Sequence, residues 1–177
     1  MKRFFSKNMI IIAPVLVAVL TVLDQWTKAL AVQHLKGKEP FVIWDGVLEF
    51  RYHENTGAAW GMLKEQQMLF YILTIIFCAV VLIEIYRLRK DMRYMPFNYT
   101  LILVLAGALG NFIDRVLNQF VVDFIYVKLI DFPIFNVADC YITVSVVILV
   151  LLMFFYYSDE EFDRMIPLFS GKKKKEA

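Results

Sequence analysis

Long apolar runs alternate with shorter polar connections along this chain, and four of the runs are long enough to cross a membrane. They cover about residues 9–32, 68–86, 97–117 and 136–157. A helix rises about 1.5 Å per residue, so about 20 apolar residues span roughly 30 Å of hydrocarbon. The pattern therefore predicts four transmembrane helices. We expect residues 1–157 to form one integral membrane domain, followed by a charged cytoplasmic tail at residues 158–177.

A pattern with a period of two lies between the first and second apolar runs. Apolar and polar residues alternate from Leu48 to His53, and Asp45-Gly46 just before them is a turn signal. Alternation of this kind is typical of a β-strand. We therefore expect a hairpin of residues 41–43 and 47–52 within an outer β region at about residues 41–61. The predicted fold class is an all-α membrane bundle of four transmembrane helices with a small extracytoplasmic β-sheet.

Two stripes of polar residues interrupt the last two apolar runs at helical spacing. They are Gly107, Asn111, Asp114 and Arg115 on one run, and Asn136, Asp139 and Thr143 on the next. An ionisable group at membrane depth costs about 2.5 kcal/mol or more, so such groups usually face a bundle interior or a water-filled cavity. The two stripes are therefore the first candidates for a functional site.

Asp123 and Asp139 stand at the ends of successive runs, where a tight return of the chain would bring them together. We expect them to converge from neighbouring membrane helices near the outer face. Two carboxylates a few ångströms apart in a poorly hydrated site share one proton near neutral pH. Such a pair suits peptide hydrolysis, because one member takes a proton from water and the other donates one to the carbonyl oxygen. Asp139 alone could merely complement a helix dipole, but that does not account for Asp123.

Other polar residues allow two interpretations each. Asp24 and Lys28 stand four residues apart in the order that favours an ion pair, which could orient the first helix or take part directly in chemistry. Asp114 and Arg115 could bond a cap or a loop at a helix end. Asn55 could anchor a loop or contact a substrate.

Composition and charge support a membrane protein and indicate its orientation. The chain is 60% hydrophobic and has a mean hydropathy of +0.60, which is too apolar for a soluble domain. Twelve of its 19 Lys and Arg residues lie on the N-terminus, the second connection and the tail, and five lie on the first and third connections. The positive-inside rule therefore predicts that both termini are cytoplasmic. The first run could imitate a cleavable signal peptide, but three spans follow it, so we interpret it as an uncleaved anchor.

Cysteine and histidine spacing argues against several kinds of site. Cys78 and Cys140 have no paired spacing, so neither a disulfide framework nor a redox motif is indicated. His53-Glu54 does not continue into a zinc-protease motif, because Gly57 stands where the second histidine would be. We expect no metal, no cofactor and no nucleic-acid partner. Neither candidate aspartate is followed by Thr-Gly or Ser-Gly, so a pepsin-type protease is not indicated either.

The chain resembles the lipoprotein signal peptidases, the signal peptidase II family. The resemblance rests on five blocks that occur in the family's order between residues 24 and 139. The blocks are Asp24-Gln25 with Lys28, Asn55-Thr56-Gly57-Ala58-Ala59-Trp60-Gly61, Gly107 with Asn111, Asp114 and Arg115, Val122-Asp123-Phe124, and Phe135-Asn136-Val137-Ala138-Asp139. One such block would be weak, whereas five in order are highly specific.

The resemblance implies an aspartic endopeptidase in the bacterial cytoplasmic membrane, with its active site near the outer face. Its substrates would be diacylglyceryl-modified prolipoproteins, cut just before the modified cysteine of the lipobox, with membrane lipids around it and globomycin as an inhibitor. By the family's pattern Asp123 and Asp139 are the catalytic pair, and the outer sheet resembles a cradle on the membrane. The implied substrate-binding or supporting residues are Asn55, Gly57, Asn111, Arg115, Asn136, Asp24 and Lys28.

Two other classes of protein compete with the peptidase. A small proton-coupled transporter could use Asp24, Lys28, Asp123 and Asp139 as a proton relay, but four spans without an evident inverted repeat argue against it. A non-catalytic scaffold could be held together by buried polar contacts, for which clustered carboxylates would be an odd choice. Neither class accounts for the five blocks.

Overall fold

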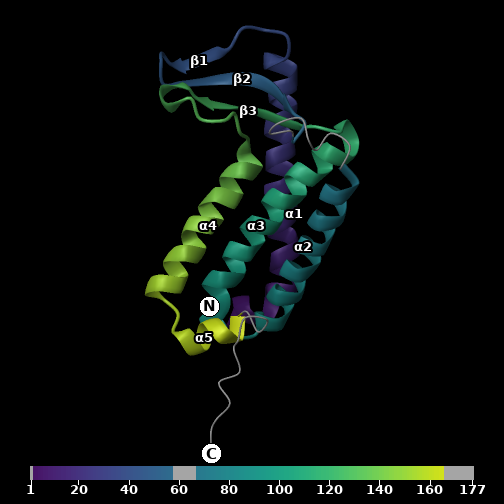
Figure 1. Ribbon diagram of the computed structural model, residues 1–177. Coiled ribbons are helices and arrows are strands. Elements are labelled where there is room, and N and C mark those ends of the chain that lie inside the picture. Colours follow the sequence, from purple (N-terminus) through teal and green to yellow (C-terminus); the bar gives the residue numbers. More distant parts are fainter. Residues whose placement is uncertain (1, 58–66, 166–177) are drawn as a thin grey trace, which may run out of the picture.

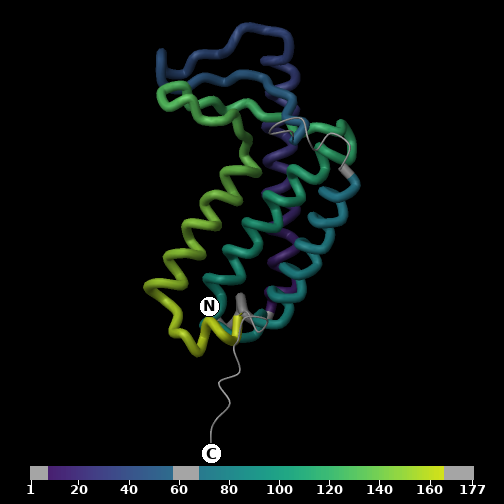
Figure 2. The backbone as a smooth tube through the Cα atoms, viewed as in Figure 1, coloured from purple at the N-terminus to yellow at the C-terminus, as the bar shows by residue number. Residues whose placement is uncertain are grey.

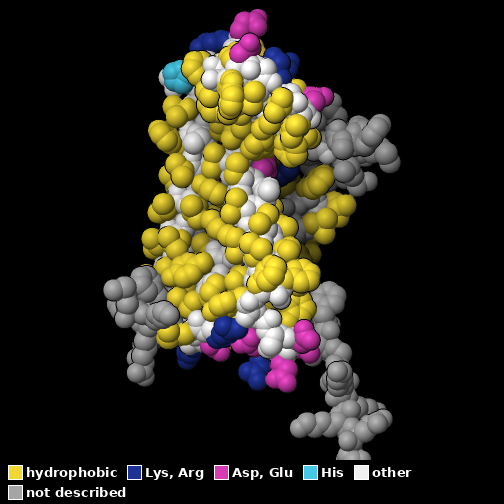
Figure 3. Space-filling view, turned by 90° about the vertical axis from the view of Figure 1, so that its left-hand side faces the viewer, with side chains coloured by type: hydrophobic (Ala, Val, Ile, Leu, Met, Phe, Trp, Pro, Cys, Tyr) yellow, Lys and Arg dark blue, Asp and Glu magenta, His cyan; other side chains and the backbone are white. Residues whose placement is uncertain are grey.

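Four long helices and a small sheet make up the computed structural model, which describes residues 2–57 and 67–165 (Figure 1). The helices are α1 (Lys2–Leu35), α2 (Gln67–Leu88), α3 (Met95–Asn118) and α4 (Val137–Phe155). All four are long and apolar enough to cross a membrane. On the face that Figure 3 shows, charged side chains gather at the two ends of the bundle, and the surface between them is mostly hydrophobic. The predicted class of membrane bundle is therefore confirmed.

Helix α3 is the central helix, because it packs against each of the other three. Two glycines make the packing close on two sides. A Cβ atom at Gly107 would lie 2.6 Å from the carbonyl oxygen of Ala138 on α4, and one at Gly110 would lie 2.5 Å from Oδ2 of Asp24 on α1. Small residues of this kind let membrane helices approach each other closely. As a result, the first turn of α4 and the polar part of α1 meet on α3.

The sheet lies at one end of the bundle and has three antiparallel strands in the order β1-β2-β3. The strands are β1 (Phe41–Trp44), β2 (Leu48–Asn55) and β3 (Val121–Val127). The predicted hairpin is present, and Gly46 adopts the left-handed φ of +70° that its turn requires. Residues 58–61 of the expected outer β region lie outside the described residues.

Strand β3 corrects one expectation, because it carries Asp123. This aspartate does not belong to a membrane helix: it lies directly opposite His53 of β2 in the sheet. On the other edge of β3, the Ile125 and Phe135 backbones exchange two hydrogen bonds of 2.8 and 3.0 Å. The chain therefore leaves β3, passes through a short 3-10 turn at Lys128–Ile130, and returns beside Asp123 before α4 begins.

The opposite end of the bundle is closed by a short helix, α5 (Asp159–Met165), which was not predicted. Glu161 pairs with Arg93 at 2.7 Å, and this contact lowers the pKa of Glu161 to about 2. Arg87 donates a 2.9 Å hydrogen bond to the backbone oxygen of Met165, whose side chain is buried. This part of the tail is therefore packed against the bundle. The basic stretch at residues 172–175 lies outside the described residues.

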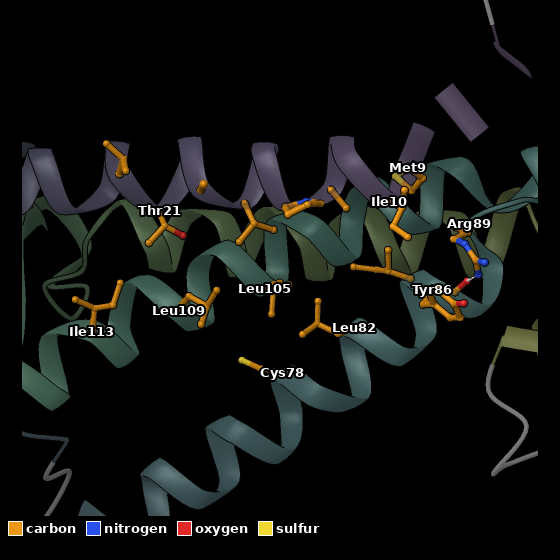
Figure 4. A pocket seen from close by; sticks show the side chains of 16 residues that line it. Met9, Ile10, Thr21, Cys78, Leu82, Tyr86, Arg89, Leu105, Leu109 and Ile113 are labelled. Carbon is orange, nitrogen blue, oxygen red and sulfur yellow. Dashed lines mark hydrogen bonds between the residues drawn. The ribbon is translucent and has the colours of Figure 1, made fainter. Parts of the chain in front are cut away.

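An apolar groove of about 690 Å³ separates α1 from α2 in the membrane-spanning part (Figure 4). Leu105, Leu109 and Ile113, four residues apart on α3, line its floor. None of the candidate site residues lines this groove, and Asn111 lies about 200° around α3 from Leu109 at about 100° per residue. The groove is therefore a lipid-facing hollow on a different side of α3 from the polar stripe.

Candidate active site

Asp123 is held by two amides where the sheet meets the bundle. Its side chain is 1% exposed. Its Oδ2 accepts a 2.9 Å hydrogen bond from Nδ2 of Asn55, and its Oδ1 accepts a 2.6 Å bond from Nδ2 of Asn136. Asn55 belongs to β2 and Asn136 immediately precedes α4. The position of this carboxylate therefore depends on both the sheet and the start of α4.

Asp139 lies in the first turn of α4 and is half-buried. Asn136 and Asp139 form a reciprocal cap, in which Oδ1 of Asn136 accepts from the Asp139 amide at 3.0 Å and Oδ2 of Asp139 accepts from the Asn136 amide at 3.1 Å. The other carboxylate oxygen of Asp139 accepts a 2.8 Å bond from Nδ2 of Asn111. Both oxygens of this carboxylate are thus fixed by N–H donors.

Two asparagines connect the two carboxylates. Nδ2 of Asn136 bonds Asp123 and also donates to Oδ1 of Asn111 at 3.1 Å. Asn136 contacts Asp123 through its side chain and Asp139 through its backbone, and Asn111 closes the chain of hydrogen bonds. The two acids are therefore neighbours at the sheet end of the bundle.

The surroundings of the two carboxylates differ. Burial raises the pKa of Asp123 above its ordinary value, and the nearby Asp139 charge adds to this, while the bonds from Asn55 and Asn136 oppose it. Asp139 lies at the N-terminus of a helix, where the backbone dipole favours a negative charge. The surroundings of Asp123 therefore favour its protonated form.

A buried ion cluster lies beside the two acids. The Nζ atom of Lys28 is 2.8 Å from Asp24 and 3.2 Å from Asp114, and the three side chains are at most 3% exposed. Lys28 also donates a 3.0 Å bond to Oδ1 of Asn111. Asp24 and Lys28 thus form the ion pair that their spacing predicts. Through Asn111, the cluster contacts the network that holds Asp139.

The two carboxylates of this ion cluster also bind the backbone on either side of the site. Oδ1 of Asp24 accepts from the Ala138 amide at 2.8 Å, next to Asp139. Oδ2 of Asp114 accepts from the Val122 amide at 3.0 Å, next to Asp123. Asp24 and Asp114 therefore fix the backbones that carry both candidate acids.

Gln25 is a supporting residue to which the sequence analysis assigned no role. Its Nε2 lies 2.9 Å from Oδ1 of Asp114 and 3.0 Å from the carbonyl oxygen of Gly110, so it links α1 to α3. The only indication of such a role in the sequence is the position of Gln25 beside Asp24 in the first block. Its partners on α3 are more than 80 residues away, however, and local spacing does not show them.

Gly57 and Arg115 lie at the margin of the network. The Gly57 amide donates a 2.9 Å bond to Oδ1 of Asn55, which orients the Asn55 amide toward Asp123, and the φ of +75° at Gly57 favours glycine. Arg115 donates to the backbone oxygen of Asn111 at 3.3 Å, and its guanidinium lies 5.8 Å from the ring centre of Phe70 on α2. Arg115 makes no hydrogen bond or ion pair with either aspartate. Ala58-Ala59-Trp60-Gly61 lie outside the described residues.

Comparison with known proteins identifies the family of the chain. A family model described as signal peptidase (SPase) II matches residues 16–155. The chain belongs to the signal peptidase II family. The lipoprotein signal peptidase of Geobacillus kaustophilus (strain HTA426) is 47% identical over 133 residues, which are 74% of this chain and 85% of the relative. The lipoprotein signal peptidase of Staphylococcus aureus (strain MRSA252) is 40% identical over 150 residues, or 83% of this chain and 88% of the relative.

Solved structures agree with this membership. A bacterial membrane enzyme solved by the in meso method at 2.3 Å resolution is 34% identical, with a TM-score of 0.68 over 93% of each chain. Another, at 1.9 Å resolution, is 35% identical, with a TM-score of 0.70 over 82% of this chain and 94% of that one. The chain is therefore a multi-pass membrane enzyme, an aspartic endopeptidase with lipoprotein signal peptidase activity. The transporter and scaffold interpretations are set aside.

Proposed function

We propose that this signal peptidase II hydrolyses the bond before the diacylglyceryl-modified cysteine of a prolipoprotein, and that Asp123 and Asp139 together activate the water. The observation that carries the proposal is the hydrogen-bonded link between the two carboxylates through Asn136 and Asn111. Two acids with unequal surroundings are the arrangement that lets one accept a proton while the other donates one.

The reaction follows from the roles of the two acids. Ionised Asp139 takes a proton from water as the water oxygen attacks the scissile carbonyl carbon, and protonated Asp123 donates its proton to the carbonyl oxygen. The tetrahedral intermediate then collapses: Asp123 takes a proton back from a hydroxyl of the intermediate as the C=O bond re-forms, the C–N bond breaks, and the leaving nitrogen takes a proton from Asp139. One acid is again protonated and the other ionised. Asn55, Asn111 and Asn136 hold the carboxylates in place through this cycle.

The position of the site suits a substrate that stays in the bilayer. A recess beneath the sheet, bordered by hydrophobic side chains, shows both acidic and basic colour (Figure 3). We propose that it admits the prolipoprotein sideways, so that two acyl chains remain among membrane lipids. The N-terminal half of α1 and helix α5 both lie toward the end of the bundle opposite the sheet (Figure 2). With the clustered basic residues, this supports cytoplasmic termini and an outward-facing site.

Cleavage in sided membrane vesicles tests the proposal. A prolipoprotein peptide with a diacylglyceryl-modified cysteine, added to the outside of right-side-out vesicles, should be cut before that cysteine, as mass spectrometry of the products would show. The matched peptide with an unmodified cysteine should remain whole, and globomycin should block the reaction. Equal cleavage of both peptides would contradict the proposed substrate class. Cleavage only in inverted vesicles would contradict the orientation.

The pH profile of an Asn55 variant tests the assignment of the acid. Activity should fall as the pH rises through the pKa of Asp123, because the proton donor is lost. The hydrogen bond from Asn55 lowers that pKa, so Asn55→Ala should move the high-pH limb of kcat to higher pH while lowering the maximum. Measuring kcat from acidic to alkaline pH checks this. An unmoved limb, or a limb at lower pH, would contradict the assignment of Asp123 as proton donor.

A further inference from the structure

An outer cleft of about 400 Å³ lies on the sheet beside the candidate active site. Arg51 and His53 of β2 form one side of it, and Tyr126, Asp131 and Ile134 form the other. Both sides lead to the catalytic pair. His53 lies directly opposite Asp123 in the sheet, and Ile134 stands two residues before Asn136.

The direction in which the substrate chain crosses the site indicates that its mature part, the segment after the modified cysteine, leaves through this cleft. The signal peptide lies in the bilayer, whereas the chain after the modified cysteine must leave toward water on the side of the sheet. An extended peptide advances about 3.3 Å per residue, as β2 does. Arg51 precedes His53 by two residues, so a peptide that leaves Asp123 along β2 reaches the level of Arg51 at about its second or third residue after the cysteine.

Arg51 differs in its contacts from two neighbouring cations of the outer region. Lys36 pairs with Glu54 at 2.9 Å, and Lys128 pairs with Glu49 at 3.3 Å. Among the residues that the structure describes, Arg51 makes no hydrogen bond or ion pair, and it is exposed. The acid across the cleft, Asp131, already accepts a hydrogen bond from the Tyr126 hydroxyl at 2.5 Å. The cleft therefore offers an incoming peptide a guanidinium that is not already held in an ion pair.

We propose that this outer cleft is a subsite for the mature segment of the prolipoprotein, in which Arg51 selects acidic side chains at the second or third position after the modified cysteine. The inference rests on the proposed function, since it uses the same substrate and the same scissile bond. Guanidinium and carboxylate form paired hydrogen bonds, so an acidic residue is favoured there over a neutral one and a basic residue is repelled.

Charge reversal on both partners tests the subsite. Three diacylglyceryl-modified peptides would carry Glu-Glu, Ser-Ser or Lys-Lys at these two positions. The full-length enzyme would be placed in zwitterionic lipid vesicles, so that membrane charge does not affect the binding of the peptides. The wild-type enzyme should cleave Glu-Glu with a kcat/KM about fivefold above that for Lys-Lys, the effect of an exposed ion pair. Arg51→Glu should reverse this order, and Arg51→Gln should abolish the preference.

Two further variants make the result specific. Lys38→Glu makes the same change of charge at an exposed residue that does not line the outer cleft, so it should keep the wild-type order. Asp131→Asn removes the acid of the cleft and should strengthen the preference for Glu-Glu. Both variants should still cleave the Ser-Ser peptide.

The outcomes separate this inference from the proposed function. Equal cleavage of the three peptides by the wild-type enzyme, or an unchanged order in Arg51→Glu, would overturn the subsite while leaving the peptidase activity intact. A reversal caused equally by Lys38→Glu would also overturn it, because the effect would then be one of general charge. If the wild-type enzyme cleaved none of the peptides, the proposed function itself would fail.

Discussion

Asp123→Asn and Asp139→Asn are each expected to lower kcat/KM for a lipid-modified prolipoprotein by about 10³-fold or more. An amide can neither take the proton of the attacking water nor donate one to the carbonyl oxygen. The reason to expect a joint effect is that the two carboxylates are held by one hydrogen-bonded network. Because they act as a unit, the double variant should be little worse than either single variant.

The asparagine substitutions are conservative tests of this pair. An asparagine at 123 or 139 keeps one oxygen that can accept from Asn136 or Asn111, so the variants should fold and insert as the wild type does. Asp45→Asn removes a carboxylate from an exposed turn and should leave the activity unchanged. A folded Asp123→Asn or Asp139→Asn enzyme that cleaves at the wild-type rate would show that the acids do not activate the water.

Lys28→Met is expected to lower the free energy of unfolding by about 3–5 kcal/mol, because it leaves Asp24 and Asp114 buried without their cation. Methionine has a similar length and packs well in an apolar core, so the effect reports the lost charge rather than a cavity. Denaturant-induced unfolding of the purified protein, followed by a spectroscopic signal, would measure the change.

A matched control for Lys28 exists on the outer surface. Lys36 also pairs with an acid, Glu54, at 2.9 Å, but both side chains are exposed. Exposed pairs contribute little, so Lys36→Met should leave unfolding nearly unchanged. Adding Asp114→Asn to Lys28→Met should recover part of the stability, since one of the two unpaired charges is then removed. Equal stability of Lys28→Met and wild type would show that the buried ion cluster does not stabilise the fold.

Much of this architecture follows from local patterns in the sequence. Apolar runs of about 20 residues predict membrane helices whatever their partners are, and the alternation from Leu48 to His53 predicts a strand. The polar stripe of α3 lies on the side of the helix that meets the candidate acids, as its helical spacing predicts. The cap formed by Asn136 and Asp139 follows from their separation by three residues, just after Pro133.

Other parts depend on contacts between distant residues, which local patterns do not show. Strand β3 is apolar on both faces from Val121 to Val127, apart from Asp123, so it has no alternation to detect. Asn55, which donates a hydrogen bond to Asp123, is 68 residues away in the chain. A strand and a short apolar piece of helix give the same local signal, and only pairing with β2 decides between them. Asp123 was therefore expected on a helix, although its closeness to Asp139 was expected.

The placement of Asp123 on β3 has a consequence for how the enzyme matures in the membrane. Asp139 lies on a membrane helix, whereas the position of Asp123 depends on the pairing of β3 with β2 and with Phe135. On the proposed mechanism, a chain whose outer strands have not paired has only one of its two acids in place and cannot activate the water.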